Sequence, residues 1–150
     1  MFKITKTGSG NYEYGCVFKP RVNGKVTALR CLMPEIDNYR VTLWDSSTKT
    51  ILASVTITGD DTIYGNTVNI APQAVKSGQP YLLSIRSIGK KWYEFRNHAG
   101  GQLSYPLSSN YIQVTGYLWK STVAIGDPVF PTNISTTYIS GLADFSFQPD

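Results

Sequence analysis

Residues 39–58, with the sequence YRVTLWDSSTKTILASVTIT, carry the pattern that decides the fold. Apolar and polar residues alternate on both sides of the polar run 46–49, which is the period of a β-strand with one buried face. The alternating apolar residues are Tyr39, Val41, Leu43, Ala53, Val55 and Ile57. The segment therefore predicts two antiparallel strands joined by a polar turn.

Period-two segments cover most of the chain from Tyr12 onward, and helical periodicity is nearly absent. The other expected strands are residues 12–21, 25–32, 67–70, 81–87, 92–95, 111–120 and 142–148. Pro72 and Pro80 fit strand ends but not central ladders. The pattern predicts an all-β antiparallel sandwich or jelly roll of roughly eight to ten strands, and a partly open barrel is the competing fold.

The chain length of 150 residues fits one domain, 1–150, in which residues 1–11 are expected to form a loosely ordered lead-in. No stretch approaches the length of an apolar membrane span, so insertion into a membrane is not expected. The first residues lack the apolar segment of a secretory signal, and we expect either a cytoplasmic protein or a mature or excised piece of a larger one.

Asn23-Gly24 separates the first two expected strands, and this dipeptide favours the tight turn of a β-hairpin. A two-residue turn would place six residues on one apolar face. The opposed pairs would be Phe18 with Leu29, Cys16 with Cys31 and Tyr14 with Met33. Cys16 and Cys31 would then form a hydrogen-bonded pair, whose side-chain geometry is usually unfavourable for a disulfide, so two buried thiols are the favoured alternative.

Several pieces of the sequence occur in a familiar order between Tyr12 and Pro149, which is nearly the whole chain. They are Tyr12-Glu13-Tyr14-Gly15-x-x-Phe18, Val22-Asn23-Gly24-Lys25-Val26-Thr27, Leu43-Trp44-Asp45, Leu52-Ala53, Val75-x-x-Gly78-x-x-Tyr81-x-x-Ser84, Phe130-Pro131-Thr132 and Asp144-Phe145-Ser146-Phe147-Gln148-Pro149. In this order the chain resembles a bacterial domain-of-unknown-function family, number 4082. The resemblance implies a β-sandwich of secreted or surface-attached proteins, with no established activity. The chain departs from the family pattern at residues 34–38, where a longer loop is usual, and at Leu142, where an aromatic residue is usual.

Catalytic motifs are scarce in the sequence. His98 is the only histidine, and no Gly-x-Ser-x-Gly or His-Glu-x-x-His motif occurs. A glycosidase needs only two carboxylates, but most of the ten acidic residues fall in expected turns. We therefore do not expect an enzyme or a cofactor. Structural calcium is the one ion that the sequence leaves open, through Asp60 and Asp61, and a plain polar loop is the favoured reading of these two residues.

The most suggestive segment is residues 90–98, KKWYEFRNH, in which three aromatic residues are interleaved with cations and amides. Aromatic faces stack against the C–H faces of sugars, while polar side chains hydrogen-bond the hydroxyl groups. The candidate glycan-binding residues are Trp92, Tyr93, Arg96, Asn97 and His98, with Tyr117 and Trp119 beside them if the two strands pair. The same chemistry holds single-stranded nucleic acid, but only this one short segment is clearly basic, so nucleic acid is not an expected partner.

The residue pattern thus predicts a non-catalytic module that binds carbohydrate, and the resemblance to family 4082 implies that it belongs to an extracellular or cell-surface bacterial protein. The alternative is a structural or adhesion spacer without a small-ligand site, for which the three Trp residues would be mostly buried. The expected partner is a glycan in the first case and a surface protein in the second.

Overall fold

The structure, a computed structural model, describes residues 2–60, 62, 64–97 and 102–150, and for residues 2–7 it describes the backbone alone. This part of the chain forms strands without a helix, which confirms the all-β prediction. The strands are β1 (Phe2–Thr7), β2 (Asn11–Pro20), β3 (Gly24–Leu32), β4 (Asn38–Asp45), β5 (Thr50–Thr58), β6 (Asn66–Val75), β7 (Tyr81–Ile88), β8 (Trp92–Asn97), β9 (Leu107–Ser108), β10 (Ile112–Ser121), β11 (Asn133–Ser135), β12 (Tyr138–Ser140) and β13 (Leu142–Pro149).

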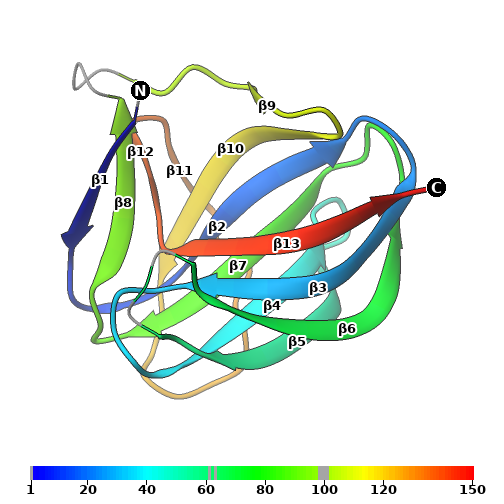
Figure 1. The fold of residues 1–150 in the computed structure, drawn as a ribbon. Coiled ribbons are helices and arrows are strands. Elements are labelled where there is room, and N and C mark those ends of the chain that lie inside the picture. The colour runs from blue at the N-terminus through cyan, green and yellow to red at the C-terminus, as the bar shows by residue number, and fades with distance from the viewer. Residues whose placement is uncertain (1, 61, 63, 98–101) are drawn as a thin grey trace.

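The strands form three antiparallel sheets (Figure 1). The large sheet has the order β11-β10-β2-β7-β4-β5, with β9 paired to β10. The facing sheet, β13-β3-β6, lies in front of it in Figure 1, and the end sheet, β1-β8-β12, stands at one end of both. The large and facing sheets make the two layers of a β-sandwich, as the strand pattern predicts. Nowhere in the described residues is there a helix long and apolar enough to cross a membrane.

The main core lies between the large sheet and the facing sheet. Phe18 of β2 stacks on Phe145 of β13 across this gap, with 4.4 Å between the ring centroids. Val41 and Leu43 of β4 are fully buried, because period two turns them towards the same core. β4 pairs with β5 in register, with Val41 opposite Val55, so the hairpin predicted from residues 39–58 is confirmed.

The hairpin predicted around Asn23-Gly24 is wrong. β2 pairs with β7 and β10 in the large sheet, whereas β3 pairs with β13 and β6 in the facing sheet. The chain therefore crosses from one layer to the other between these strands, and neither Asn23 nor Gly24 has the positive φ that the expected turn requires. The six residues of the predicted apolar face still belong to the core or pack against it, but they meet across the sandwich.

Contacts with distant segments hold the Asn23-Gly24 connection. The backbone N–H of Ser77 donates to Asn23 Oδ1 at 2.9 Å, and the N–H of Asp150 donates to Asn23 O at 3.1 Å. At Gly24 an added Cβ would lie 2.4 Å from the backbone oxygen of Gln148. The Asn-Gly pair thus lies where the chain crosses between the two layers. Glycine is needed there because the backbone of Gln148 approaches it closely, and not because of a turn with positive φ.

The described residues contain thirteen strands, more than the eight to ten expected. The additional ones are short: β9, β11 and β12 span two or three residues each, which is too few to show a period. Residues 2–7, expected to be a loosely ordered lead-in, form β1 and pair with β8. Pro72 lies inside β6, where an edge strand tolerates it beside a shift in register.

Cys16 and Cys31 are free thiols on strands of different sheets, and their predicted opposition is therefore wrong. Burial raises the pKa of both thiols from about 9 to about 12. A shift of this size lowers the thiolate fraction near pH 8 by about a thousandfold, and the thiolate is the reactive species.

We therefore expect unreduced protein to show two titratable thiols after unfolding and very slow labelling in the native state. Ellman's reagent, with and without denaturant, makes both measurements. If the unfolded chain shows no reactive thiol, the two cysteines are bonded and the arrangement described above is wrong.

Candidate functional site

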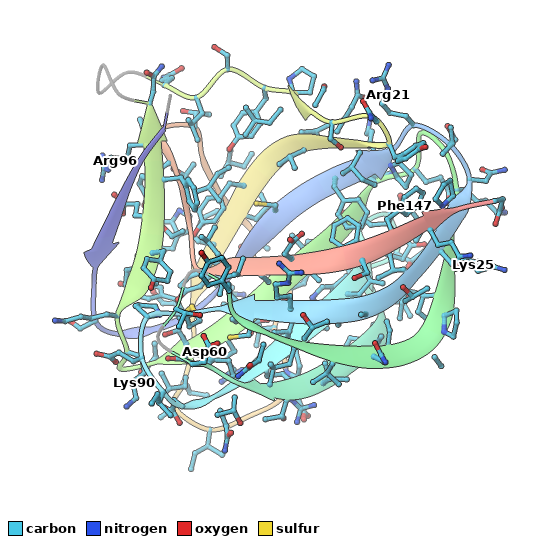
Figure 2. The ribbon with its side chains drawn as sticks, in the orientation of Figure 1. Arg21, Lys25, Asp60, Lys90, Arg96 and Phe147 are labelled. Atoms are coloured by element: carbon cyan, nitrogen blue, oxygen red, sulfur yellow. The ribbon has the colours of Figure 1, made fainter. Side chains whose placement is uncertain are left out.

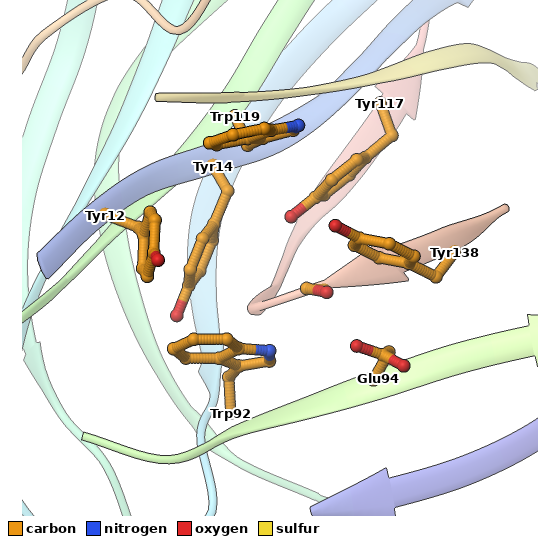
Figure 3. A pocket seen from close by; sticks show the side chains of 8 residues that line it. Tyr12, Tyr14, Trp92, Glu94, Tyr117, Trp119 and Tyr138 are labelled. Atoms are coloured by element: carbon orange, nitrogen blue, oxygen red, sulfur yellow. The ribbon is translucent and has the colours of Figure 1, made fainter. Parts of the chain in front are cut away.

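A pocket lined mainly by tyrosine and tryptophan side chains lies where the end sheet meets one end of the large sheet, and its cavity volume is about 140 Å³ (Figure 3). We call it the aromatic pocket. Its eight lining residues are Tyr12, Tyr14, Trp92, Glu94, Tyr117, Trp119, Tyr138 and Ser140. Six of the eight carry aromatic rings, and Glu94 is the one charged residue among them.

Strand pairing brings these residues together in two groups. In the large sheet β2 and β10 are neighbours, and Trp119 lies opposite Tyr14. In the end sheet β8 and β12 are neighbours, and Ser140 lies opposite Glu94. Since side chains two apart in a strand share a face, Trp92 lies on the same face of β8 as Glu94. The pocket is the space between these two faces.

Tyr12 links the two halves of the pocket. Its ring makes edge contacts with Trp92, at 5.4 Å between centroids, and with Trp119, at 6.1 Å. Tyr14 makes a further edge contact with Trp92 at 5.6 Å. Tyr14 and Tyr117 are buried and form the floor, whereas Tyr12, Trp92 and Trp119 are half-buried, so part of these three rings can be reached from solvent.

Three polar atoms of the lining are buried and make no hydrogen bond within the described protein: Tyr14 Oη, Trp92 Nε1 and Ser140 Oγ. Tyr14 and Ser140 each have a hydroxyl neighbour, Ser87 and Tyr117, but neither pair reaches full hydrogen-bond geometry. Trp92 Nε1 is a donor without such a neighbour. A buried polar group without a partner costs roughly 1–3 kcal/mol, and this cost falls most clearly on Trp92 Nε1.

Glu94 and Arg96 form the charged side of the pocket. Arg96 Nε donates to Glu94 Oε1, and the guanidinium lies over the ring of Tyr138, 5.1 Å from its centroid. The Glu94 side chain is 10% exposed and that of Arg96 48% exposed. The carboxylate therefore belongs to the pocket wall, and the guanidinium lies at the rim.

The tyrosines of the floor are neutral hydroxyl groups. Burial raises the pKa of both Tyr14 and Tyr117 well above the usual value of a phenol. Both side chains therefore keep their protons at physiological pH and can donate or accept a hydrogen bond.

The structure brings Trp92, Tyr117 and Trp119 of the predicted site into one pocket. It does so although β8 and β10 do not pair, because β8 pairs with β1 and β12. Arg96 lies at the rim as described above. The segment is a strand, as expected for residues 92–95, and of its three aromatic residues Trp92 lines the pocket.

Tyr93 is buried and does not line the pocket, since it lies on the other face of β8. Asn97 ends β8, and its Nδ2 donates to the backbone oxygen of Gln102 at 3.5 Å. His98 lies outside the described residues.

Five lining residues are absent from the sequence prediction: Tyr12, Tyr14, Glu94, Tyr138 and Ser140. Glu94 could have been predicted from the sequence, because alternation along the strand places it on the same face as Trp92. Tyr14 was expected on the apolar face of its strand, and it belongs both to the core and to the pocket. Tyr138 and Ser140 belong to a three-residue strand, for which the sequence offers no pattern.

Among the described residues no group of three or more His, Cys, Asp and Glu side chains is arranged to hold a metal ion. Asp60 Oδ1 accepts hydrogen bonds from the N–H of Thr62 at 3.1 Å and from its hydroxyl at 2.9 Å. Asp61, its predicted partner for calcium, lies outside the described residues. The calcium hypothesis stays a prediction.

A second buried polar cluster lies on the other face of the large sheet. Trp44 Nε1 donates to Ser84 Oγ at 2.9 Å, and Ser84 Oγ donates to Glu13 Oε1 at 2.6 Å. Burial raises the pKa of Glu13 to about 7, against the opposing effects of the Ser84 bond and the Arg86 charge. The cluster lies beneath the β10–β11 connection, to which Arg86 donates two hydrogen bonds. This cluster explains how Trp44 is held and does not form part of the aromatic pocket.

No protein-family model matches the chain, and no curated protein matches its sequence. The resemblance to family 4082 stays a prediction.

Gly141 permits the close approach of the β12–β13 connection to the pocket floor. Its φ is +60°, and an added Cβ would lie 1.5 Å from Cε2 of Tyr14. We expect Gly141→Ala to lower the free energy of unfolding by about 1–3 kcal/mol, measured by urea denaturation. Gly116→Ala is the matched control, because nothing lies within 4 Å of its added Cβ and it should leave stability unchanged or higher. Equal losses in the two variants would contradict the contact.

Glu13 makes stability fall as pH rises. The unfolded chain releases this proton near pH 4.5 and the native protein near pH 7, so the native state holds the extra proton in between. We expect stability to drop by up to about 3 kcal/mol from pH 4.5 to 8 through this group, at about 1.4 kcal/mol per pKa unit. Glu13→Gln should remove that drop and Asp144→Asn, an exposed carboxylate, should not. If the stability of Glu13→Gln falls with pH as steeply as that of the wild type, Glu13 is not the group responsible.

Proposed function

We propose that this chain is a non-catalytic extracellular binding module that recognises carbohydrate, with the aromatic pocket as its binding site. The observation that carries the proposal is the combination of half-buried indole faces with polar groups in the lining, of which Trp92 Nε1 has no hydrogen-bond partner among the described residues.

Sugars match this combination because they are amphipathic. The C–H face of a pyranose packs against an aromatic ring, and its hydroxyl groups donate and accept hydrogen bonds at the edge. Trp92 and Trp119 offer ring faces, and Trp92 Nε1, Tyr14 Oη and Ser140 Oγ offer the polar contacts. A purely apolar ligand would gain no hydrogen bond from these groups, whereas a sugar hydroxyl could bond the N–H of Trp92.

The number of acids in the pocket supports a binding role over hydrolysis. Glycoside hydrolysis uses two carboxyl groups on either side of the bond to be cleaved. Glu94 is the one carboxyl group among the lining residues, and it already pairs with Arg96. Glu13, the second buried carboxyl group among the described residues, belongs to the cluster on the far face of the sheet.

The distribution of positive charge supports a sugar over a nucleic acid. Figure 2 shows Lys90 and Arg96 on one side of the ribbon and Arg21 and Lys25 on the opposite side. A nucleic-acid groove needs several cations along one surface, and the described residues of the pocket lining include none. A bacterial cell-surface location is supported by the resemblance to family 4082 alone.

The exposure of tryptophan favours the binding module over the spacer. Trp44 is buried, as a spacer would have it, whereas Trp92 and Trp119 are half-buried around a hollow.

A glycan array followed by isothermal titration tests the proposal. We expect Trp119→Ala to weaken binding of the selected sugar by at least about tenfold, because truncating a central aromatic contact commonly costs more than 1 kcal/mol. Tyr111→Ala is the matched control, since it removes an exposed ring that precedes the opposite end of β10 and should leave affinity unchanged. Absence of binding to plant, host and bacterial glycans, or equal loss in both variants, would count against the pocket.

A further inference from the structure

The electrostatics of the aromatic pocket favour positive charge. The faces of aromatic rings carry negative potential, and six rings line this cavity together with the carboxylate of Glu94. Within the part of the chain whose side chains the structure describes, no lysine, arginine or histidine lines the cavity. A cation that enters the pocket is attracted by both the rings and the acid, whereas an anion is repelled by both.

Arg96 shows this preference within the protein itself. Its guanidinium is held by the Glu94 carboxylate and by the face of Tyr138, two of the groups that line the cavity. The wall of the pocket therefore already binds one cation by an ion pair together with a cation–π contact. Because half of the Arg96 side chain is exposed, a cation in the cavity can compete with it for Glu94.

The polar atoms of the pocket are arranged for a ligand that is both cationic and hydroxylated. Ser140 lies opposite Glu94 in the β8–β12 pairing, and Trp92 lies two residues before Glu94 on the same face of β8. Figure 3 shows the carboxylate of Glu94 on the same side of the pocket as Trp92 and Tyr138. An ammonium at Glu94 would thus have hydrogen-bonding groups next to it for the neighbouring hydroxyls of the same ring.

We infer that the aromatic pocket takes a sugar that carries a protonated amino group, with the ammonium at Glu94 and an apolar ring face against the indoles. This inference rests on the proposed carbohydrate-binding function and adds the charge class of the ligand. An N-acetylated sugar lacks the positive charge, and an acidic sugar brings a second anion beside Glu94. A tetraalkylammonium ion has the charge but leaves the N–H of Trp92 without a hydrogen-bond partner among the described residues.

Two substitutions at this ion pair should act in opposite directions. Glu94→Gln removes the carboxylate that attracts the ammonium, while keeping the size and hydrogen-bonding capacity of the side chain. Arg96→Gln removes the internal competitor and leaves Glu94 unpaired within the described residues. A role in folding alone predicts no such opposition, because either substitution would break the same ion pair.

The experiment is isothermal titration of the full chain with matched sugars at a pH where the amine is protonated. Glucosamine and galactosamine are each compared with their N-acetyl and hydroxyl counterparts, and glucuronic acid and tetramethylammonium complete the set. We expect an amino sugar to bind at least about tenfold more tightly than its neutral counterparts. Glu94→Gln should remove that difference, and Arg96→Gln should raise the affinity for the amino sugar severalfold.

The outcomes separate the two proposals. Equal affinity for amino and neutral sugars would overturn the charge preference and leave carbohydrate binding standing. Tetramethylammonium binding as tight as the amino sugar would show that the site recognises alkylammonium ions, and would overturn the sugar assignment. Loss of amino-sugar affinity in Arg96→Gln as well as Glu94→Gln, with melting temperatures unchanged, would contradict the competition. Failure of every probe would reject the pocket as a carbohydrate site.

Discussion

Backbone hydrogen bonding of β2 is the constraint on which the rest of the fold depends. A strand has two edges, and β2 uses one for β10 and the other for β7. β3 follows β2 in sequence but finds no free edge there, so it pairs with β13 from the end of the chain and β6 from the middle. This division of partners creates the two layers. The inward side chains of β2 and β3 then meet across the sandwich, and the hydrophobic contact between the layers replaces the hairpin contact.

Local sequence predicts which residues are buried better than it predicts which strands pair. The β4–β5 hairpin is correct because both strands and their turn lie within one segment, and alternation fixes the register. The β2–β3 hairpin is wrong because the preference of Asn-Gly for a tight turn is small beside the pairing of two whole strands with distant partners. The burial of Phe18 and Leu29 follows from period two under either topology, and it is observed. Two strands that pair although they lie about a hundred residues apart in the chain show no sign of that pairing in either local sequence.

The pocket follows the same rule. Trp92 and Trp119 could be singled out because aromatic residues stand among polar ones in their segments, but their meeting point depends on Tyr12, a residue of a third strand. Tyr138 comes from a strand too short to be recognised. A site built from four strands of two sheets is therefore predictable in its residue types and not in its membership. Glu94 was also missed, but alternation along β8 would have been sufficient to place it beside Trp92.

Tyr14 joins the pocket to the main core. Its ring is part of the main core and also of the pocket floor, so the floor cannot move without disturbing the core. A fixed floor reduces the conformational entropy that a ligand must overcome on binding. For stability alone a phenylalanine would serve at this position, because it fills nearly the same volume without burying a hydroxyl that lacks a full hydrogen bond. The same reasoning applies to the N–H of Trp92. Three of the buried polar atoms that lack a full hydrogen bond among the described residues lie in the lining of this one cavity, where a bound ligand could offset part of their cost.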